Sequence, residues 1–125
     1  MKNYTSYDLI EWGKPFEKSQ HALPEPTLSE VLIRVTAAGL CHSDLHVQKG
    51  YMDLGEEGRL TFAERGAQLP MTFGHEIAGI VEAVGDKVKN VSIGQQVLVF
   101  PWIGCGDCLA CNEDRESDCS AMRII

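Results

Sequence analysis

Residues 105–119 read CGDCLACNEDRESDC and hold four of the five cysteines of the chain. The spacing is C-x2-C-x2-C-x7-C. Two-residue gaps let one tight turn direct successive sulfurs at a single ion, and Gly104, Gly106 and Asp107 are residues that tight turns favour. Four thiolates form the closed tetrahedral ligand set of a structural zinc site. We therefore predict a structural zinc loop over residues 101–120, with the metal held by Cys105, Cys108, Cys111 and Cys119.

The cysteine pattern has two other interpretations. Bacterial iron–sulfur proteins use the run C-x2-C-x2-C-x3-C-P, whereas here the last gap is seven residues and Ser120 follows Cys119. Four unliganded thiols are the other alternative, and their crowding within fifteen residues argues against it. A disulfide framework is not expected in a chain without a secretion signal, because reducing compartments keep thiols free. Zinc is therefore the preferred occupant.

Outside this loop the pattern is mainly that of β-structure. Residues 30–37 alternate as a strand with Val31, Ile33 and Val35 on one face. A second strand is expected over Ile77–Val84, where Gly79 marks a bulge or a close backbone approach. A turn at Gly85-Asp86 follows, and residues 97–100 are expected to form a third strand, in the core. Short strands separated by glycine and proline predict a small barrel or sandwich.

One short helix is expected between the first two strands. It would run from Ser43, as the N-cap, to Lys49, and Gly50 would stop it. Residues 50–70 then form a long polar connection, with room for a helical turn near residues 60–64.

The fifth cysteine, Cys41, and His75 are candidates for a second metal site. In isolation a cysteine is most often a small buried hydrophobe and a histidine a packed side chain. However, a thiolate at the start of a helix is favoured by the helix dipole. Asp44 could orient a metal-bound imidazole, and Ser43 and His46 could carry a proton outward.

The bulk composition excludes several classes of function. The net charge is −7, and no cluster of lysine and arginine offers a surface for nucleic acid or for an anionic membrane. No stretch reaches the length of a membrane span, and the first residues lack the apolar core of a signal peptide. We therefore expect a cytoplasmic protein that has neither nucleic-acid nor membrane partners.

Taken together, the motifs resemble those of the medium-chain zinc alcohol dehydrogenases. The resemblance runs from roughly Glu30 to Cys119 and rests on GLCHSDLH at 39–46, PMTFGHEIAGIVEAVG at 70–85, G-x-x-V at 94–97 and the four-cysteine loop. It implies that this segment folds as the GroES-like, partly open β-barrel, with a short helix and a zinc-binding loop. That fold agrees with the β pattern of the sequence.

The resemblance also implies a catalytic zinc. Its protein ligands would be Cys41 and His75, with Glu76 as a neighbouring carboxylate that can join the ligand set. Asp44 would support His75 by a hydrogen bond from outside the ligand set. In the family a third ligand comes from further along the chain.

Further roles follow from the same resemblance. Ser43 would hydrogen-bond the substrate alcohol, and His46 would form the outer end of the proton relay. His42 would contact the cofactor pyrophosphate, and Trp102 would line the substrate pocket. The implied reaction oxidises a small-molecule alcohol to an aldehyde or ketone by hydride transfer to NAD or NADP.

Residues 1–125 contain no dinucleotide-binding fingerprint, and the resemblance places the Rossmann cofactor domain beyond them. We therefore expect an incomplete, N-terminal GroES-like portion of a dehydrogenase, inactive alone, that works with the remainder of its chain and forms a homo-oligomer when complete. The alternative is a stand-alone, non-catalytic zinc-binding or interaction module, which the missing cofactor domain favours. A zinc-free quinone-reductase-like relative is disfavoured because it would need neither Cys41 nor the cysteine loop. The enzyme hypothesis is favoured over the module because the chain keeps a set of residues that a purely structural module would not need: Cys41, Ser43, His46, His75 and Glu76.

Overall fold

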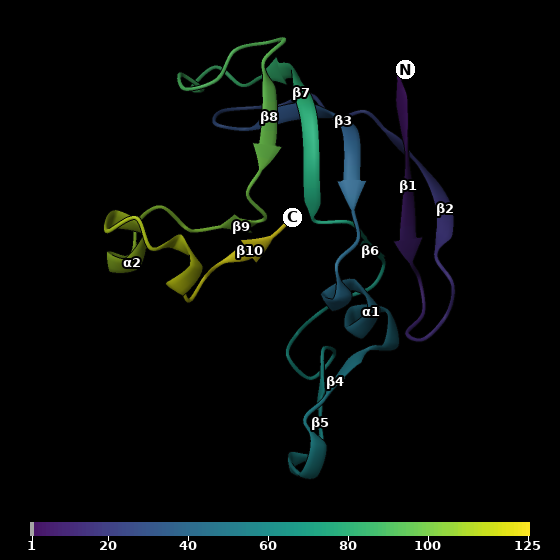
Figure 1. Ribbon diagram of the computed structural model, residues 1–125. Coiled ribbons are helices and arrows are strands. Elements are labelled where there is room, and N and C mark those ends of the chain that lie inside the picture. Colours follow the sequence, from purple (N-terminus) through teal and green to yellow (C-terminus); the bar gives the residue numbers. More distant parts are fainter. Residues whose placement is uncertain (1) are drawn as a thin grey trace.

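The computed structural model describes residues 2–125, which form ten short strands and two helices (Figure 1). None of the helices described over these residues is long and apolar enough to cross a membrane. The strands are β1 Asn3–Leu9, β2 Glu17–Ala22, β3 Val31–Gly39, β4 Tyr51–Asp53, β5 Arg59–Thr61, β6 Met71–Thr72, β7 Glu76–Val84, β8 Gln96–Val99, β9 Trp102–Ile103 and β10 Arg123–Ile124. The helices are α1 His42–Lys49 and α2 Leu109–Asn112, and single 3-10 turns lie at η1 Gly55–Glu57 and η2 Glu116–Asp118.

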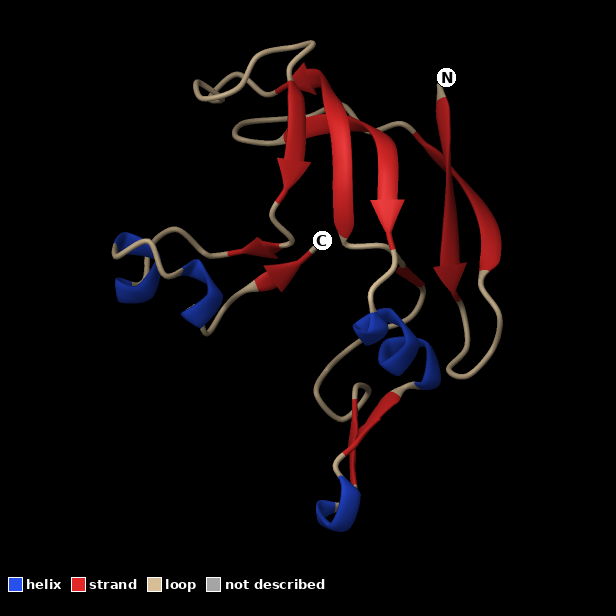
Figure 2. Cartoon of the chain, in the orientation of Figure 1, coloured by secondary structure: helices blue, strands red, loops and turns tan. Residues whose placement is uncertain are grey.

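Two three-stranded antiparallel sheets make up most of the molecule. Their strand orders are β2-β1-β6 and β3-β7-β8, and two small ribbons, β4-β5 and β9-β10, extend from them. Figure 2 shows strands in the body of the chain, with α1 below the sheets and α2 in a separate loop to one side. The predicted mainly β architecture with a short helix and a cysteine loop is confirmed, and the loop contains a second short helix, α2.

The pairing of β3 with β7 forms the centre of the second sheet. The expected close approach at Gly79 is confirmed: a Cβ there would lie 2.4 Å from Cγ2 of Ile33 and 2.7 Å from the carbonyl oxygen of Arg34. The ladder is irregular at Leu32/Ile33 and between Val35 and Ala37. Val35 is 53% exposed, so the expected apolar face is not covered along its whole length.

The expectation that the third strand lies in the core is wrong. Strand β8 forms an edge of its sheet, and Leu98 is 86% exposed. Phe100, just beyond the strand, is 61% exposed. Periodicity shows that such a segment is apolar and extended, but the depth at which it lies depends on which elements cover it.

Residues 50–70 also differ from expectation. In place of a polar loop they contain the β4–β5 hairpin, closed by η1 at its tip, and residues 60–64 are strand and turn, not helix. The guanidinium of Arg59 lies 4.2 Å from the centroid of the Tyr51 ring, which joins the two strands by a cation–π contact. The hairpin is not evident from the sequence because each of its strands is only three residues long, too short to show an alternating pattern.

The N-terminal hairpin, β1–β2, was not predicted either, yet it contains much of the fully buried material. Leu9 is 0% exposed, and Asp8 beside it is 2% exposed. A buried carboxylate needs hydrogen-bond donors, and Asp8 receives them from Ser6 and Thr72. Thr72 belongs to β6, so this cluster joins the N-terminal hairpin to the segment that leads to His75.

Candidate functional site

The four cysteines of the loop lie together, as predicted. Each offers a sulfur, and the four sulfurs all lie within 4.8 Å of one another. Cys108 caps α2 by accepting a hydrogen bond from the backbone N–H of Cys111 at 3.5 Å, and the N–H of Cys105 donates to the sulfur of Cys119 at 3.4 Å. Pairing of β9 with β10 closes the base of the loop.

Turn geometry in this loop agrees with the residues that form it. Gly106 has a φ of +84°, a conformation that side chains rarely adopt. At Gly104 a Cβ would lie 2.6 Å from the sulfur of Cys111, so only glycine leaves room for that sulfur. The glycines therefore allow the backbone to pass close to the cluster.

Crowding of the sulfurs separates the acidities of the thiols. Backbone N–H groups of Asp107 and Cys108, together with the neighbouring thiols, lower the pKa of Cys105 to about 7. Hydrogen bonding from the Gly106 backbone lowers the pKa of Cys111, but desolvation and the three nearby sulfurs outweigh it and raise that pKa to about 12. Four thiolates cannot share this space without a balancing cation, so the donor set fits a tetrahedral dication such as zinc.

The second cluster lies where β3 and β7 end. The last pair of their ladder, Gly39 with Glu76, brings the segments on either side together. Cys41 follows two residues after Gly39, and His75 immediately precedes Glu76. The Cys41 sulfur therefore lies 3.2 Å from Nε2 of His75, although the two residues are 34 apart in the sequence.

Asp44 fixes both members of this pair. Its Oδ1 lies 3.2 Å from Nδ1 of His75, and its Oδ2 accepts a hydrogen bond of 2.9 Å from the backbone N–H of Cys41. The Asp44 side chain is 8% exposed. Because one ring nitrogen faces the carboxylate, the other is left to face the sulfur, which is the arrangement found around metal-binding histidines.

The N-cap of α1 differs from the prediction. Cys41, not Ser43, is the N-cap, and its sulfur accepts a hydrogen bond of 3.3 Å from the N–H of Ser43. Asp44 completes a capping box by bonding back to the Cys41 backbone. The expected stop at Gly50 is confirmed, with a φ of +89°. The C-x-x-D spacing could have revealed this cap had cysteine been considered in the place usually taken by serine or threonine.

Electrostatics in this cluster favour charge on both Cys41 and His75. Hydrogen bonds from the Ser43 hydroxyl and backbone lower the pKa of the Cys41 thiol. Desolvation lowers the pKa of His75, but the negative charges of Asp44 and Cys41 outweigh this and raise it. The thiol is therefore predisposed to lose its proton, which is the form that binds a metal ion.

Other predicted site residues are placed less tightly. The Ser43 hydroxyl lies 3.5 Å from Nε2 of His75 and contacts the Cys41 sulfur. Potential ligand atoms of Cys41, Asp44 and His75 all lie within 4.8 Å of one another. Glu76 is not part of this group, and its carboxylate lies against Gly39.

His42 and His46 contact each other edge to face on α1, with ring centroids 4.7 Å apart. Trp102 lies on β9 and is 38% exposed.

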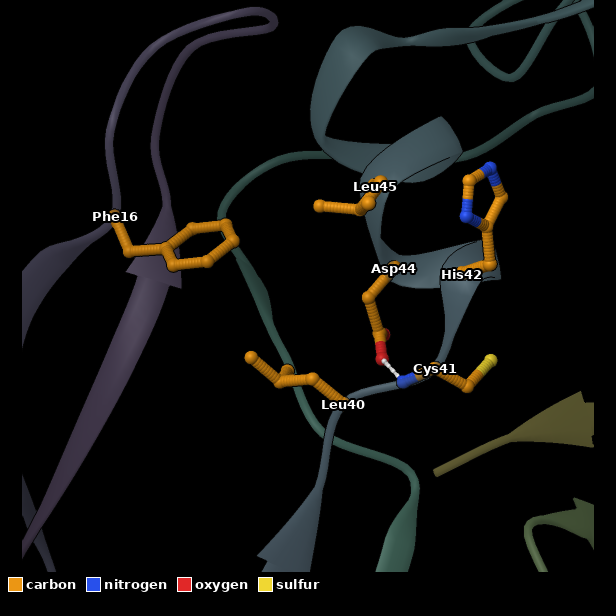
Figure 3. A pocket seen from close by; sticks show the side chains of 6 residues that line it. All are labelled: Phe16, Leu40, Cys41, His42, Asp44 and Leu45. Atoms are coloured by element: carbon orange, nitrogen blue, oxygen red, sulfur yellow. Dashed lines mark hydrogen bonds between the residues drawn. The ribbon is translucent and has the colours of Figure 1, made fainter.

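A shallow apolar hollow lies behind the Cys41 backbone. Its lining includes Phe16, Leu40 and Leu45. Figure 3 shows the Cys41 sulfur pointing away from these three side chains, while the Asp44 carboxylate bonds to the Cys41 nitrogen. The hollow therefore supports the backbone of the cluster from behind, and the sulfur faces the opposite side.

Fold and sites together define a mainly β, metal-binding domain with a closed four-sulfur site and a more open Cys–His site. The family model described as "Alcohol dehydrogenase GroES-like domain" matches residues 27–125. The chain belongs to this family, as the sequence motifs predicted. It is homologous to NAD-dependent alcohol, sorbitol and threonine dehydrogenases.

Individual relatives agree with this assignment. An NAD-dependent alcohol dehydrogenase from Sulfurisphaera tokodaii is 44% identical over 118 residues, which cover 94% of this chain and 33% of the relative. A sorbitol dehydrogenase from Bacillus subtilis is 38% identical over 105 residues, covering 82% of this chain and 27% of the relative. The chain thus spans about a third of the length of the curated relatives that it matches.

Solved structures show the same fold. The D-arabinose dehydrogenase from Sulfolobus solfataricus superposes with a TM-score of 0.77 at 30% identity, covering 100% of this chain and 34% of that one. CAD from Helicobacter pylori, solved in complex with NADP(H), gives a TM-score of 0.79 at 28% identity, covering 98% of this chain and 32% of that one.

Proposed function

We propose that this chain provides the zinc-binding, alcohol-binding portion of an NAD(P)-linked alcohol dehydrogenase. The observation that carries the proposal is the 3.2 Å approach of the Cys41 sulfur to Nε2 of His75, with Asp44 on the other ring nitrogen. A packed cysteine and histidine need no such ordered arrangement, whereas two metal ligands with a supporting carboxylate do. Residues 1–125 would form one GroES-like domain, with 101–120 as its structural zinc loop.

The two donor sets fit two different zinc sites. Cys105, Cys108, Cys111 and Cys119 form a closed set suited to holding the loop. Cys41 and His75 supply two ligands of an open site, and Glu76 is proposed as the carboxylate that joins it. Zinc held there would supply a positive charge that favours loss of the alcohol proton.

The residues of this chain would bind the alcohol and move its proton. The Ser43 hydroxyl contacts the Cys41 sulfur and lies 3.5 Å from Nε2 of His75, and it would accept the proton of an alcohol bound beside them. His46, one helical turn further along α1, would pass it to solvent. His42 is proposed to contact the cofactor pyrophosphate, and Trp102 to line the pocket.

Further partners follow from the relatives. Small-molecule alcohols, aldehydes or ketones are the proposed substrates, and NAD or NADP the hydride acceptor. A cofactor domain in the remainder of the chain would complete the active site, and the complete enzyme is proposed to be a cytoplasmic homo-oligomer.

Metal content tests the proposal directly. We expect about two zinc ions per chain by inductively coupled plasma mass spectrometry, and about one in Cys41→Ala, because that variant removes a ligand of the open site only. Cys111→Ser is the matched control, which should lose the zinc of the loop and keep that of the open site. One zinc in both the wild type and Cys41→Ala would refute the proposed catalytic zinc.

A further inference from the structure

The segment that carries His75 enters the site from a very short strand. Strand β6 consists of Met71 and Thr72 alone, three residues before His75. Within residues 2–125 its ladder partner is β1, with Thr72 opposite Asp8 and Met71 opposite Leu9. Two residue pairs make a weak ladder, so side-chain contacts must contribute to fixing where this segment lies.

Asp8 provides one of these contacts. The Thr72 hydroxyl donates a hydrogen bond of 2.7 Å to Oδ1 of Asp8. The other carboxylate oxygen accepts from the Ser6 hydroxyl at 3.0 Å and lies 3.2 Å from Nε2 of His21. Asp8 is 2% exposed and bonded on both oxygens, so the carboxylate is held in one position. Thr72 is thereby tied to a fixed point on the first sheet.

Phe73, the residue after Thr72, makes a second contact that holds this segment. Phe73 packs against Phe16, which lies just before β2, with ring centroids 4.6 Å apart. Gly74 then turns the chain with a φ of +91°, and His75 follows. Thr72 and Phe73 thus anchor the segment to the first sheet immediately before the turn.

Cys41 is positioned from the other sheet. It follows β3, whose ladder with β7 ends at Gly39 and Glu76. His75 therefore lies at the junction of the two sheets, with β6 attached to β1 on one side and β7 attached to β3 on the other. The orientation of its ring relative to Cys41 depends on both attachments.

We propose that Asp8 and Thr72 are positioning residues that set His75 against Cys41 for metal binding. This inference rests on the proposed function, because it assigns the two residues to the geometry of the proposed catalytic metal site. Over residues 2–125, the hydrogen bonds and ion pairs of Asp8 and Thr72 do not reach Cys41, Asp44 or the four-cysteine loop, so their effect would pass through the backbone from Thr72 to His75.

Thr72→Val is the decisive variant, because valine keeps the shape of threonine and removes only the hydroxyl. Thr5→Val is the matched control: it makes the same change on β1, where the Thr5 hydroxyl accepts from Gln20 of β2 at 2.6 Å and does not contact β6. Asp8→Asn is a second variant on the other side of the bond.

Co²⁺ binding is measured by absorbance on the full chain with zinc already in the cysteine loop. The absorbance that Cys41→Ser abolishes is taken as the signal of the open site. We expect Thr72→Val to weaken Co²⁺ binding there by about tenfold or more, as loss of other supporting hydrogen bonds around metal ligands does, and Thr5→Val to leave it unchanged. Equal affinity in Thr72→Val and Thr5→Val would overturn the inference.

A second readout separates this inference from the proposed function. The chemical shifts of the His75 ring nitrogens are measured by ¹⁵N NMR on metal-free protein. The His75 signals are identified as those that disappear in His75→Gln. These chemical shifts should change in Thr72→Val and Asp8→Asn and remain unchanged in Thr5→Val. A wild type without a Cys41-dependent Co²⁺ signal would refute the proposed metal site, and unmoved His75 signals in Thr72→Val would then overturn the positioning role as well.

Discussion

Gly79 has no side chain at the point where β7 passes closest to β3. We expect Gly79→Ala to lower the free energy of unfolding by about 1–3 kcal/mol, because the new methyl group meets Ile33 and the Arg34 carbonyl well inside contact distance. Urea unfolding measures the change. In an Ile33→Ala background, Gly79→Ala should cost less but still destabilise the fold, since the clash with the Arg34 carbonyl remains. Stability equal to wild type would show that the two strands can separate without cost.

Asp8 is the residue whose charge links stability to pH. Burial raises its pKa, but hydrogen bonds from Ser19, Thr72, Ser6 and His21 outweigh this and lower it to about 2, against an ordinary value of 3.8. A depressed carboxyl pKa stabilises the fold above the unfolded pKa, and the contribution is lost as the pH falls through the folded pKa. The contribution at neutral pH is on the order of 2 kcal/mol.

We therefore expect Asp8→Asn to be less stable than wild type at neutral pH, and the difference to shrink as the pH falls from about 4 to about 2. Urea unfolding at a series of pH values measures it. Asp86→Asn, which changes an exposed carboxyl in a turn, is the control and should show no such trend. A stability difference between Asp8→Asn and wild type that is independent of pH would contradict a stabilising role for the Asp8 charge.

At the scale of elements, the cysteine loop depends on its metal more than any other part. Its helix, α2, is four residues long and its strands, β9 and β10, are two residues each, so neither propensity nor packing can hold them. We expect a chelator to raise amide hydrogen exchange across residues 101–124 and to leave the β1–β2 hairpin protected. Cys111→Ser should reproduce the effect without chelator. Uniform exchange along the whole chain would instead indicate that the metal holds the entire fold.

At the scale of the whole molecule, the second sheet carries an exposed apolar edge. Leu98, on β8, is 86% exposed, and Phe100, just beyond the end of the strand, is 61% exposed. Exposed apolar side chains on an edge strand favour association. We expect the 125-residue chain to self-associate at high concentration and Leu98→Lys to reduce this, as measured by sedimentation velocity. Ile93→Lys, at an exposed isoleucine outside the strand, is the control, and an equal effect of both would point to net charge as the cause.

Sequence alone predicted the family, the mainly β class, the four-cysteine cluster and the pairing of Cys41 with His75. These features depend on local chemistry or on ordered motifs: two-residue gaps between cysteines, a glycine where two strands approach, and a glycine that ends a helix. The cysteine spacing and the helix stop are visible in the chain because they act on neighbouring residues. The pairing of Cys41 with His75, which lie 34 residues apart, was instead implied by the resemblance of the ordered motifs to a known family.

Tertiary structure decided the rest. Contacts between elements place β8 at an edge of its sheet. Pairing of β4 with β5 folds residues 50–70 into a hairpin, and the hydrogen bond from the Cys41 backbone to Asp44 makes Cys41 the cap of α1. The buried carboxylate of Asp8 was invisible in the sequence, because its partner Thr72 lies 64 residues away and an aspartate in a polar segment is most often exposed. Burial and long-range hydrogen bonding are properties of packed elements, so they exist only once the sheets have come together.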